Sequence, residues 1–298
     1  MAAPTQQKQN EPIHQMLAAK AFFETPSTQL TAQMEQDFFS SLMARNKTYK
    51  TTFRQRFADV NPHLVRSLRD SASSSVRVLD IGVSYGVSTV ELYEDLRAAG
   101  LEARIVATDI LTDACLVRVW PHCHALLDHS GFPLRFDLPW GTMKPWVVAD
   151  DYRSGRFILR KGINKALTHR ARRILARPDD ARITCVKLVT PRLLANDDIT
   201  VCTDDISRHN SAFAGSFELI RAANVLNRGY FSEAVLADMV ANVRRYLNAA
   251  GGYLLVVRTH QDNSNHGTLF RLGHNQRFEA VWRTGGGSEV EQIVLDAP

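Results

Sequence analysis

The sequence predicts an α/β protein built on a doubly wound, mainly parallel sheet. Residues 76–109 contain a strand, a glycine-bearing turn, a helix and a second strand, and strand and helix patterns alternate again between 199 and 258. Such a βαβ unit places its strands parallel, with a right-handed crossover. The composition, with 45% apolar and 22% charged residues in 298, is that of an ordinary folded protein.

Composition also narrows the cellular setting. No apolar run approaches the ~18–20 residues of a membrane span, and the first residues lack a hydrophobic signal core, so we expect no transmembrane segment and a cytoplasmic location. The four cysteines form no CxxC pair, which favours free thiols in a reducing compartment. Between Lys144 and Arg177, ten Lys/Arg stand against Asp150 and Asp151, so this segment carries +8 of a total net charge of +5.

Residues 1–75 predict a helical N-terminal cap. They contain no glycine. Leu30, Met34, Phe38 and Leu42 recur at the spacing of one helix face. An alternative hypothesis is that this cap, together with Tyr49, closes over a ligand.

The main domain is expected over 76–298. A first strand covers Val76–Ile81, a helix follows from Val87 to Arg97, and a second strand covers Arg104–Asp109. Later strands are predicted at 199–203, 217–222 and 253–258, with a helix over 232–247 that Ser232 caps. Short strands are expected at 268–272, 278–282 and 290–295.

The stretch from about 111 to 198 is too long for a βα connection, since most such loops have ~2–6 residues. It predicts an inserted subdomain that shapes a substrate pocket. Within it lies a basic amphipathic helix whose apolar face includes Ile163, Leu167 and Ile174. The preferred interpretation is that this basic face is exposed to solvent. An alternative is that it binds an anionic small-molecule substrate or a lipid surface. A nucleic acid partner is not favoured, because aromatic residues are not interleaved with the basic ones.

The turn after the first predicted strand indicates a ligand-binding site. Glycine at a strand-to-helix turn lets backbone approach a ligand, and a carboxylate closing the next strand can accept both ribose hydroxyls. Gly82 and Asp109 occupy these places. The spacing lacks the G-x-G-x-x-G of dinucleotide sites, so a nucleoside ligand is favoured over a dinucleotide.

The run Val78-Leu-Asp80-Ile-Gly82-Val-Ser84-Tyr-Gly86, followed by Ala107-Thr-Asp109, resembles the first two motifs of class I S-adenosylmethionine-dependent methyltransferases. Thr203-Asp204-Asp205-Ile206 is similar to the acidic motif that meets the adenine amine in that family, and Phe217–Asn227 and 247–257 to its later motifs. Ser84 departs from the usual middle glycine. The resemblance implies a Rossmann-like methyltransferase fold and a site for S-adenosyl-L-methionine. It assigns that site to Asp80, Gly82, Val83, Ser84, Gly86, Asp109, Ile110, Asp204, Asp205, Ile206 and Asn224.

Two local stretches, Ala107–Ile110 and Asn224–Leu226, also resemble chemotaxis-receptor methyltransferases, but the first motif differs and a protein substrate is not carried over. The resemblance implies a methyl transferase acting on a small molecule or natural-product intermediate. A sulfonium methyl is already activated, so catalysis needs placement of a nucleophile more than a strong acid. Tyr230 and His260, expected beyond the carboxyl ends of strands, are the candidate catalytic residues.

Other readings stay open. The same cofactor could have its aminocarboxypropyl arm transferred or cyclised, or the fold could serve as a non-catalytic binding module. Gly82-Val-Ser84-Tyr-Gly86 also spells the G-x-S-x-G elbow of α/β-hydrolases, with Ser84 as nucleophile and Asp238 and His260 as partners. That reading lacks preceding strands and an upstream glycine loop. A metal site around His122-Cys123-His124, with Cys115, Asp128 and His129, lacks the usual ligand spacing, and we expect none.

Overall fold

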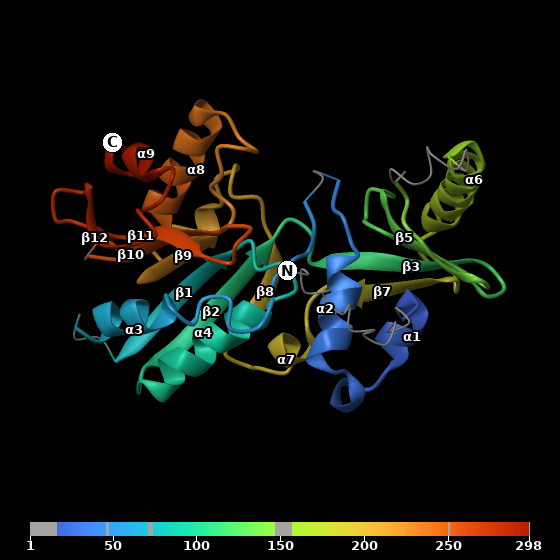
Figure 1. Ribbon diagram of the computed structural model, residues 1–298, viewed down its shortest axis with the longest axis horizontal. Helices are drawn as coiled ribbons and strands as arrows, with labels where there is room; N and C mark the ends of the chain where they lie inside the picture. The colour runs from blue at the N-terminus through green and yellow to red at the C-terminus, as the bar shows by residue number, and fades with distance from the viewer. Residues whose placement is uncertain (1–16, 46–47, 71–73, 147–156, 250, 298) are drawn as a thin grey trace, which may run out of the picture.

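The chain folds around two separate β-sheets, which form the two halves of the molecule in Figure 1. The computed structural model describes residues 17–45, 48–70, 74–146, 157–249 and 251–297. Residues 71–73, near the predicted end of the N-terminal cap, and the acidic pair Asp150 and Asp151 lie outside these ranges. Within the described ranges, no helix is both long and apolar enough to cross a bilayer.

The larger sheet has seven strands in the order β12-β11-β10-β9-β1-β2-β8. Five neighbouring strands, from β10 to β8 in this order, run parallel to one another. The other two, β11 and β12, add an antiparallel meander beside β10 at one edge. This confirms the predicted α/β fold with a mainly parallel sheet. The strands are β1 Ser75–Ile81, β2 Glu102–Asp109, β8 Ile199–Thr203, β9 Leu219–Ala223, β10 Tyr253–Thr259, β11 Asn265–Leu272 and β12 Phe278–Thr284.

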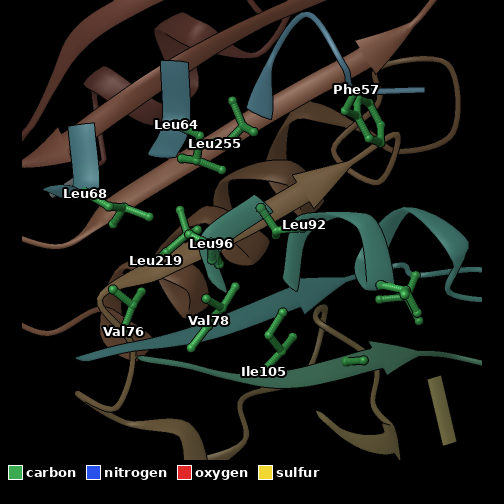
Figure 2. Close-up of a cluster of buried hydrophobic side chains, with 14 of the residues drawn as sticks. Phe57, Leu64, Leu68, Val76, Val78, Leu92, Leu96, Ile105, Leu219 and Leu255 are labelled. Carbon is green, nitrogen blue, oxygen red and sulfur yellow. The ribbon is translucent and has the colours of Figure 1, made fainter. Parts of the chain in front are cut away.

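Helices cover both faces of this sheet (Figure 1). Helices α3 (Asn61–Arg69) and α4 (Val87–Ala98) lie on one face, and α8 (Glu233–Tyr246) and α9 (Glu291–Leu295) on the other. Because side chains alternate along a strand, Val76 and Val78 of β1 face the first layer while Leu79 and Ile81 face the second. Figure 2 shows the first layer, where Leu64 and Leu68 of α3 and Leu92 and Leu96 of α4 meet residues of β1, β2, β9 and β10.

Two local predictions are wrong. Residues 290–295, expected as a strand, form helix α9. Val290, Ile293, Val294 and Ala297 are all buried against the α8 layer, and their i, i+3, i+4, i+7 spacing is that of a helix. Ser232 precedes α8 as expected, but its side chain accepts no capping hydrogen bond.

The smaller sheet is antiparallel, in the order β6-β5-β4-β3-β7, and is formed within the stretch between β2 and β8. Helix α6 (Phe157–Leu175) packs on one face through Leu167, Ala171 and Ile174. The short helix α7 (Pro191–Leu194) leads back to β8. The strands are β3 Asp113–Trp120, β4 Cys123–Leu127, β5 Pro133–Leu138, β6 Gly141–Met143 and β7 Ile183–Lys187.

The N-terminal region divides between the two halves. Helices α1 (Ala19–Glu24) and α2 (Ala32–Ser40), separated by a 3-10 turn at Ser27–Gln29, cover the other face of the smaller sheet. Helix α3 instead packs against α4 of the larger sheet. Phe39 of α2 stacks on Tyr85 with ring centroids 4.9 Å apart. Tyr85 follows Ser84 in the glycine turn, so the aromatic cluster of α1 and α2 supports this turn.

Candidate functional site

A cavity of about 480 Å³ opens at the carboxyl ends of β1, β2, β8 and β9. Strand β1 lies between β2 and β9. The chain adds β2 and β8 on one side of β1 and β9 and β10 on the other, so the strand order reverses at β1. Ligands of open α/β sheets bind at such a reversal of strand order. The volume is within the ~300–1,000 Å³ typical of small-molecule sites. The N-terminal segment 48–57 forms the facing wall.

The turn from β1 into α4 forms the floor of the cavity. Gly82 and Ser84 have positive φ angles of 73° and 59°, and Gly82 N donates to Thr108 O over 2.7 Å. Ser84 Oγ is buried and has no hydrogen-bond partner among the described residues. A buried unpaired hydroxyl costs free energy unless a ligand satisfies it. Gly86 ends the turn behind the cavity, against Leu193.

Asp109 lies at the end of β2 and lines the cavity. Its Oδ2 accepts from Ser84 N over 2.8 Å and its Oδ1 from Leu111 N over 3.0 Å. The Lys50 ammonium is 3.5 Å from Oδ1 and donates to Ser84 O over 2.8 Å. Burial lowers the pKa of Lys50 from its ordinary 10.5, against the opposing effect of the Asp109 charge. A carboxylate has about four lone-pair sites, so Asp109 keeps acceptor capacity for a ligand hydroxyl.

Asp80 does not line the cavity. Its carboxylate lies behind the turn, where Arg221 of β9 donates through Nε to Oδ1 over 2.8 Å and through Nη2 to Oδ2 over 2.5 Å. Thr89 of α4 donates to Oδ2 as well, over 2.7 Å. Asp80 and Arg221 are direct partners in the β1–β9 register and both are fully buried. Asp80 therefore holds β1, β9 and α4 together beneath the turn, instead of touching a ligand.

The segment after β8 supplies further acids. Asp204, Asp205 and Ile206 all line the cavity. Asp204 Oδ1 accepts from Asn210 over 2.9 Å, and burial raises the pKa of Asp204 above its ordinary 3.8. Asp205 accepts from the backbone and hydroxyl of Ser207, which fixes its loop. Carboxylates therefore gather at this end of the cavity.

Asn224 directly follows β9 and lines the cavity with a φ of 60°. Its side-chain oxygen accepts from Thr259 N over 2.9 Å, so it joins the ends of β9 and β10. Val83 and Ile110 also line the cavity. The structure therefore gathers nine of the eleven residues expected at the cofactor site around one space, with Asp80 and Gly86 behind it.

The two candidate catalytic residues are separated. Tyr230 lines the cavity and its side chain is 61% exposed at the rim. His260 is not among the lining residues, and its ring lies against His266 with centroids 4.1 Å apart. His260 is therefore not placed at reacting atoms.

The hydrolase reading is not supported by this geometry. A serine nucleophile needs a base within hydrogen-bond reach, yet Ser84 Oγ meets no described partner. Asp238 is exposed on α8, and His260 lies outside the cavity. The left-handed Ser84 backbone instead turns its N–H toward Asp109.

The residues around the suggested metal site are spread over a strand and its turns. Cys123 is buried in β4, while His122 occupies a left-handed turn position. Across the described ranges, no group of three or more His, Cys, Asp or Glu side chains could hold a metal ion.

The sequence reasoning missed the basic wall of the cavity. Lys50 and Arg56 come from the N-terminal segment, and Arg258 comes from the end of β10, next to Thr259. Arg56 donates to Thr259 Oγ1 over 2.9 Å and to Thr51 O over 2.8 Å, and no described carboxylate pairs with it. Burial, with the nearby Arg221 charge, lowers the pKa of Arg56. From this segment, the sequence analysis singled out Tyr49 alone, as part of a cap over the ligand.

No family model matches the chain, and no curated protein matches its sequence. Solved structures are similar to it in fold. The PH0226 protein from Pyrococcus horikoshii has 13% identity and a TM-score of 0.35, covering 81% of this chain and 79% of that one. The CurJ carbon methyltransferase has 16% identity and a TM-score of 0.32, covering 70% and 37%. A SAM-dependent methyltransferase from Aquifex aeolicus has 9% identity and a TM-score of 0.30, covering 69% and 67%.

Several of the similar structures are named as methyltransferases, the class that the motifs of this chain resemble, and one is named as an alcohol dehydrogenase. The chain spans between 28% and 58% of three further matches, less than two thirds of their length. All of these likenesses have TM-scores below 0.5 and concern the fold.

Proposed function

We propose that this protein binds S-adenosyl-L-methionine and transfers its methyl group to a small-molecule acceptor. The observation that carries the proposal is the polarity of the cavity. Asp204 and Asp205, in the loop after β8, line the cavity on one side of β1. Arg56, which is hydrogen-bonded to Thr259 at the end of β10, lines it on the other side. A ligand with a nucleoside part and an amino acid part matches this arrangement.

The residues present fit such a ligand. The orphaned hydroxyl of Ser84 is a polar group that a ligand would satisfy. Asp109 has acceptor capacity left for a ribose hydroxyl, and Asp204 or Asp205 can accept from an amino group on the base. The Arg56 guanidinium, without a described carboxylate partner, can receive the carboxylate of the amino acid part.

The chain's own residues then have separable tasks. When bound, the cofactor supplies a methyl group already activated by its sulfonium, so the protein chiefly positions the acceptor. Segment 48–52 lines the cavity, and this wall should limit the access of water to a bound ligand. Tyr230 at the rim can orient an acceptor or hold its proton by its hydroxyl. The basic wall favours an acceptor that carries negative charge.

Calorimetric titration of S-adenosyl-L-methionine into the whole chain tests the binding step. We expect micromolar affinity, about −8 kcal/mol. Asp204→Asn keeps the shape of the side chain and should weaken binding tenfold or more, because it replaces an acceptor oxygen by a donor. Asp197→Asn, exposed before β8, should bind as wild type does. No binding to wild type would overturn the proposal.

Product analysis tests the reaction. With a panel of small-molecule acceptors, S-adenosylhomocysteine should accumulate and methylthioadenosine should not. Tyr230→Phe should lower turnover while leaving cofactor affinity unchanged, and Tyr93→Phe, remote on α4, serves as the matched control. Methylthioadenosine as the product would show transfer or cyclisation of the other arm. Binding without any product would indicate a non-catalytic module.

A further inference from the structure

Two cysteines face each other on adjacent strands of the smaller sheet, and neither lines the cavity described above. Cys115 of β3 and Cys185 of β7 are direct partners in the antiparallel register. Their side chains therefore point to the same face of the sheet. Both cysteines are free thiols.

The hydrogen bonds beside them define the type of pair. Arg118 N donates to O of the opposite residue Arg182 over 2.9 Å, and Leu188 N donates to O of the opposite residue Thr112 over 2.8 Å. In antiparallel strands, hydrogen-bonded pairs alternate with pairs that are not hydrogen-bonded. Cys115 lies three residues from both Thr112 and Arg118, so it and Cys185 form a pair that is not hydrogen-bonded.

That position suits a covalent bond. Directly opposed residues of this kind have Cα atoms about 4.5 Å apart, and disulfides span Cα distances of about 4.4–6.8 Å. Neither strand has to shift for the two sulfurs to meet. We propose that Cys115 and Cys185 form a reversible intramolecular disulfide under oxidising conditions.

The two thiols differ in exposure to solvent, and this difference determines which of them reacts first with an oxidant. Cys185 is exposed on the edge strand β7 and lines a surface cavity of about 480 Å³, beside Arg182 and Lys187. Cys115 is buried, and burial, with the neighbouring Cys185 as a second cause, raises the pKa of its thiol to about 11. Cys185 therefore meets an oxidant first, and Cys115 waits as the protonated partner.

The reaction balances with a hydroperoxide as oxidant. The Cys185 thiolate attacks hydrogen peroxide, which gives a sulfenic acid and hydroxide. The Cys115 sulfur then attacks the Cys185 sulfur, and water leaves. His129 Nδ1, 3.6 Å from Cys115 Sγ, is placed to accept the Cys115 proton. Two thiols are oxidised, and one peroxide is reduced to two waters.

The bond would join the two strands that connect the halves of the protein. β3 begins four residues after Asp109, and β7 is followed at once by Leu188 and the α7 segment. The disulfide would tie both connections at one point. This inference does not depend on the proposed function.

Tryptic mapping of the peroxide-treated full chain tests the inference directly. Cleavage after Arg104 and Arg118 releases a peptide with Cys115 alone, and cleavage after Arg182 and Lys187 releases one with Cys185 alone. We expect these two peptides to be linked, and to separate with dithiothreitol. Thiol titration in denaturant should fall from four to two.

Two variants complete the design. Cys185→Ser changes an exposed side chain and should lose no thiols to peroxide, whereas Cys202→Ser should still lose two. A Cys185–Cys185 link between two chains would overturn the inference. So would over-oxidation of Cys185 with the Cys115 peptide left free.

Discussion

The Lys50 ammonium lies 3.5 Å from Oδ1 of Asp109, and Lys50 is only 4% exposed. The same ammonium donates to Ser84 O. One side chain of the N-terminal segment therefore touches Asp109 and Ser84, two of the residues that the sequence motifs assign to the ligand. The covering segment and the glycine turn are joined by this contact, so ordering of one orders the other.

Lys50→Met tests this coupling, because it removes the cation and keeps most of the stem. We expect the free energy of unfolding to fall by about 1–3 kcal/mol, since a charged hydrogen-bonding partner of a mostly buried carboxylate is lost. Cofactor affinity should fall as well, because segment 48–52 loses its anchor. Denaturant unfolding and calorimetry measure the two effects.

Lys20→Met is the matched control for that variant. Lys20 also pairs with a carboxylate, Glu24, but its side chain is 51% exposed. Exposed pairs contribute little, so stability should stay within about 0.5 kcal/mol. Equal losses in the two variants would show that the Lys50 contact does not tie the segment to the turn.

The buried pair of Asp80 and Arg221 predicts that the stability losses of two single substitutions do not add in the double variant. Arg221→Met leaves a carboxylate buried with only Thr89 as a side-chain donor, which should cost about 3–5 kcal/mol. Asp80→Leu should cost a similar amount by stranding the guanidinium. The double variant should recover most of the loss, because an apolar pair of similar volume is often tolerated. Urea unfolding of the four proteins gives the coupling, and additive losses would contradict the prediction.

A methyl group at Gly82 should be harmful for two separable reasons. Its Cβ would lie 2.2 Å from Val225 Cγ2, and its φ of +73° is unfavourable for L side chains. We expect Gly82→Ala to cost more than the ~1–3 kcal/mol of backbone strain alone. Val225→Ala should relieve the clash and leave the strain, so the double variant should be more stable than Gly82→Ala. Thermal unfolding compares the stabilities of Gly82→Ala and the double variant. If Val225 does not fill the space beside Gly82, the double variant should be the less stable of the two.

Short-range patterns explain why much of the larger sheet could be predicted. The helix expected over 232–247 runs over 233–246, and the strand expected at 199–203 has those bounds. Apolar periodicity and turn residues are local signals, so they appear in one sequence. Residues 290–295 show the weakness of this method, since β-branched side chains there suggested a strand while the burial spacing is helical.

Contacts between distant segments explain what could not be predicted. Arg221 stands in an otherwise apolar strand, and its role appears only when β9 is placed beside β1. Lys50 carries no local pattern at all, and only the fold brings it to Asp109. The sequence thus located the glycine turn and the acids, while the basic wall depends on how the N-terminal segment crosses the sheet.

Glu35 of α2 predicts how stability depends on pH. It is 6% exposed, and its Oε1 accepts from Thr190 Oγ1 over 2.8 Å. Burial raises the pKa of Glu35 above its ordinary 4.5, although Thr190 and Arg192 act in the opposite direction. Above pH 4.5 the folded chain therefore binds more protons at this site than the unfolded chain. Its contribution to the free energy of unfolding falls as pH rises through the raised pKa.

Glu35→Gln keeps an acceptor for Thr190 and cannot ionise, so it should remove this dependence. We expect the variant to gain stability relative to wild type as pH rises from 4.5 to 7.5, by about 1.4 kcal/mol for each unit by which the pKa is raised. Urea unfolding at several pH values measures the difference. Glu102→Gln, exposed at the start of β2, should show no such trend. If the stability difference between Glu35→Gln and wild type does not change with pH, the Glu35 carboxyl is not penalised by burial, and α2 packs less tightly against Thr190 than the contact implies.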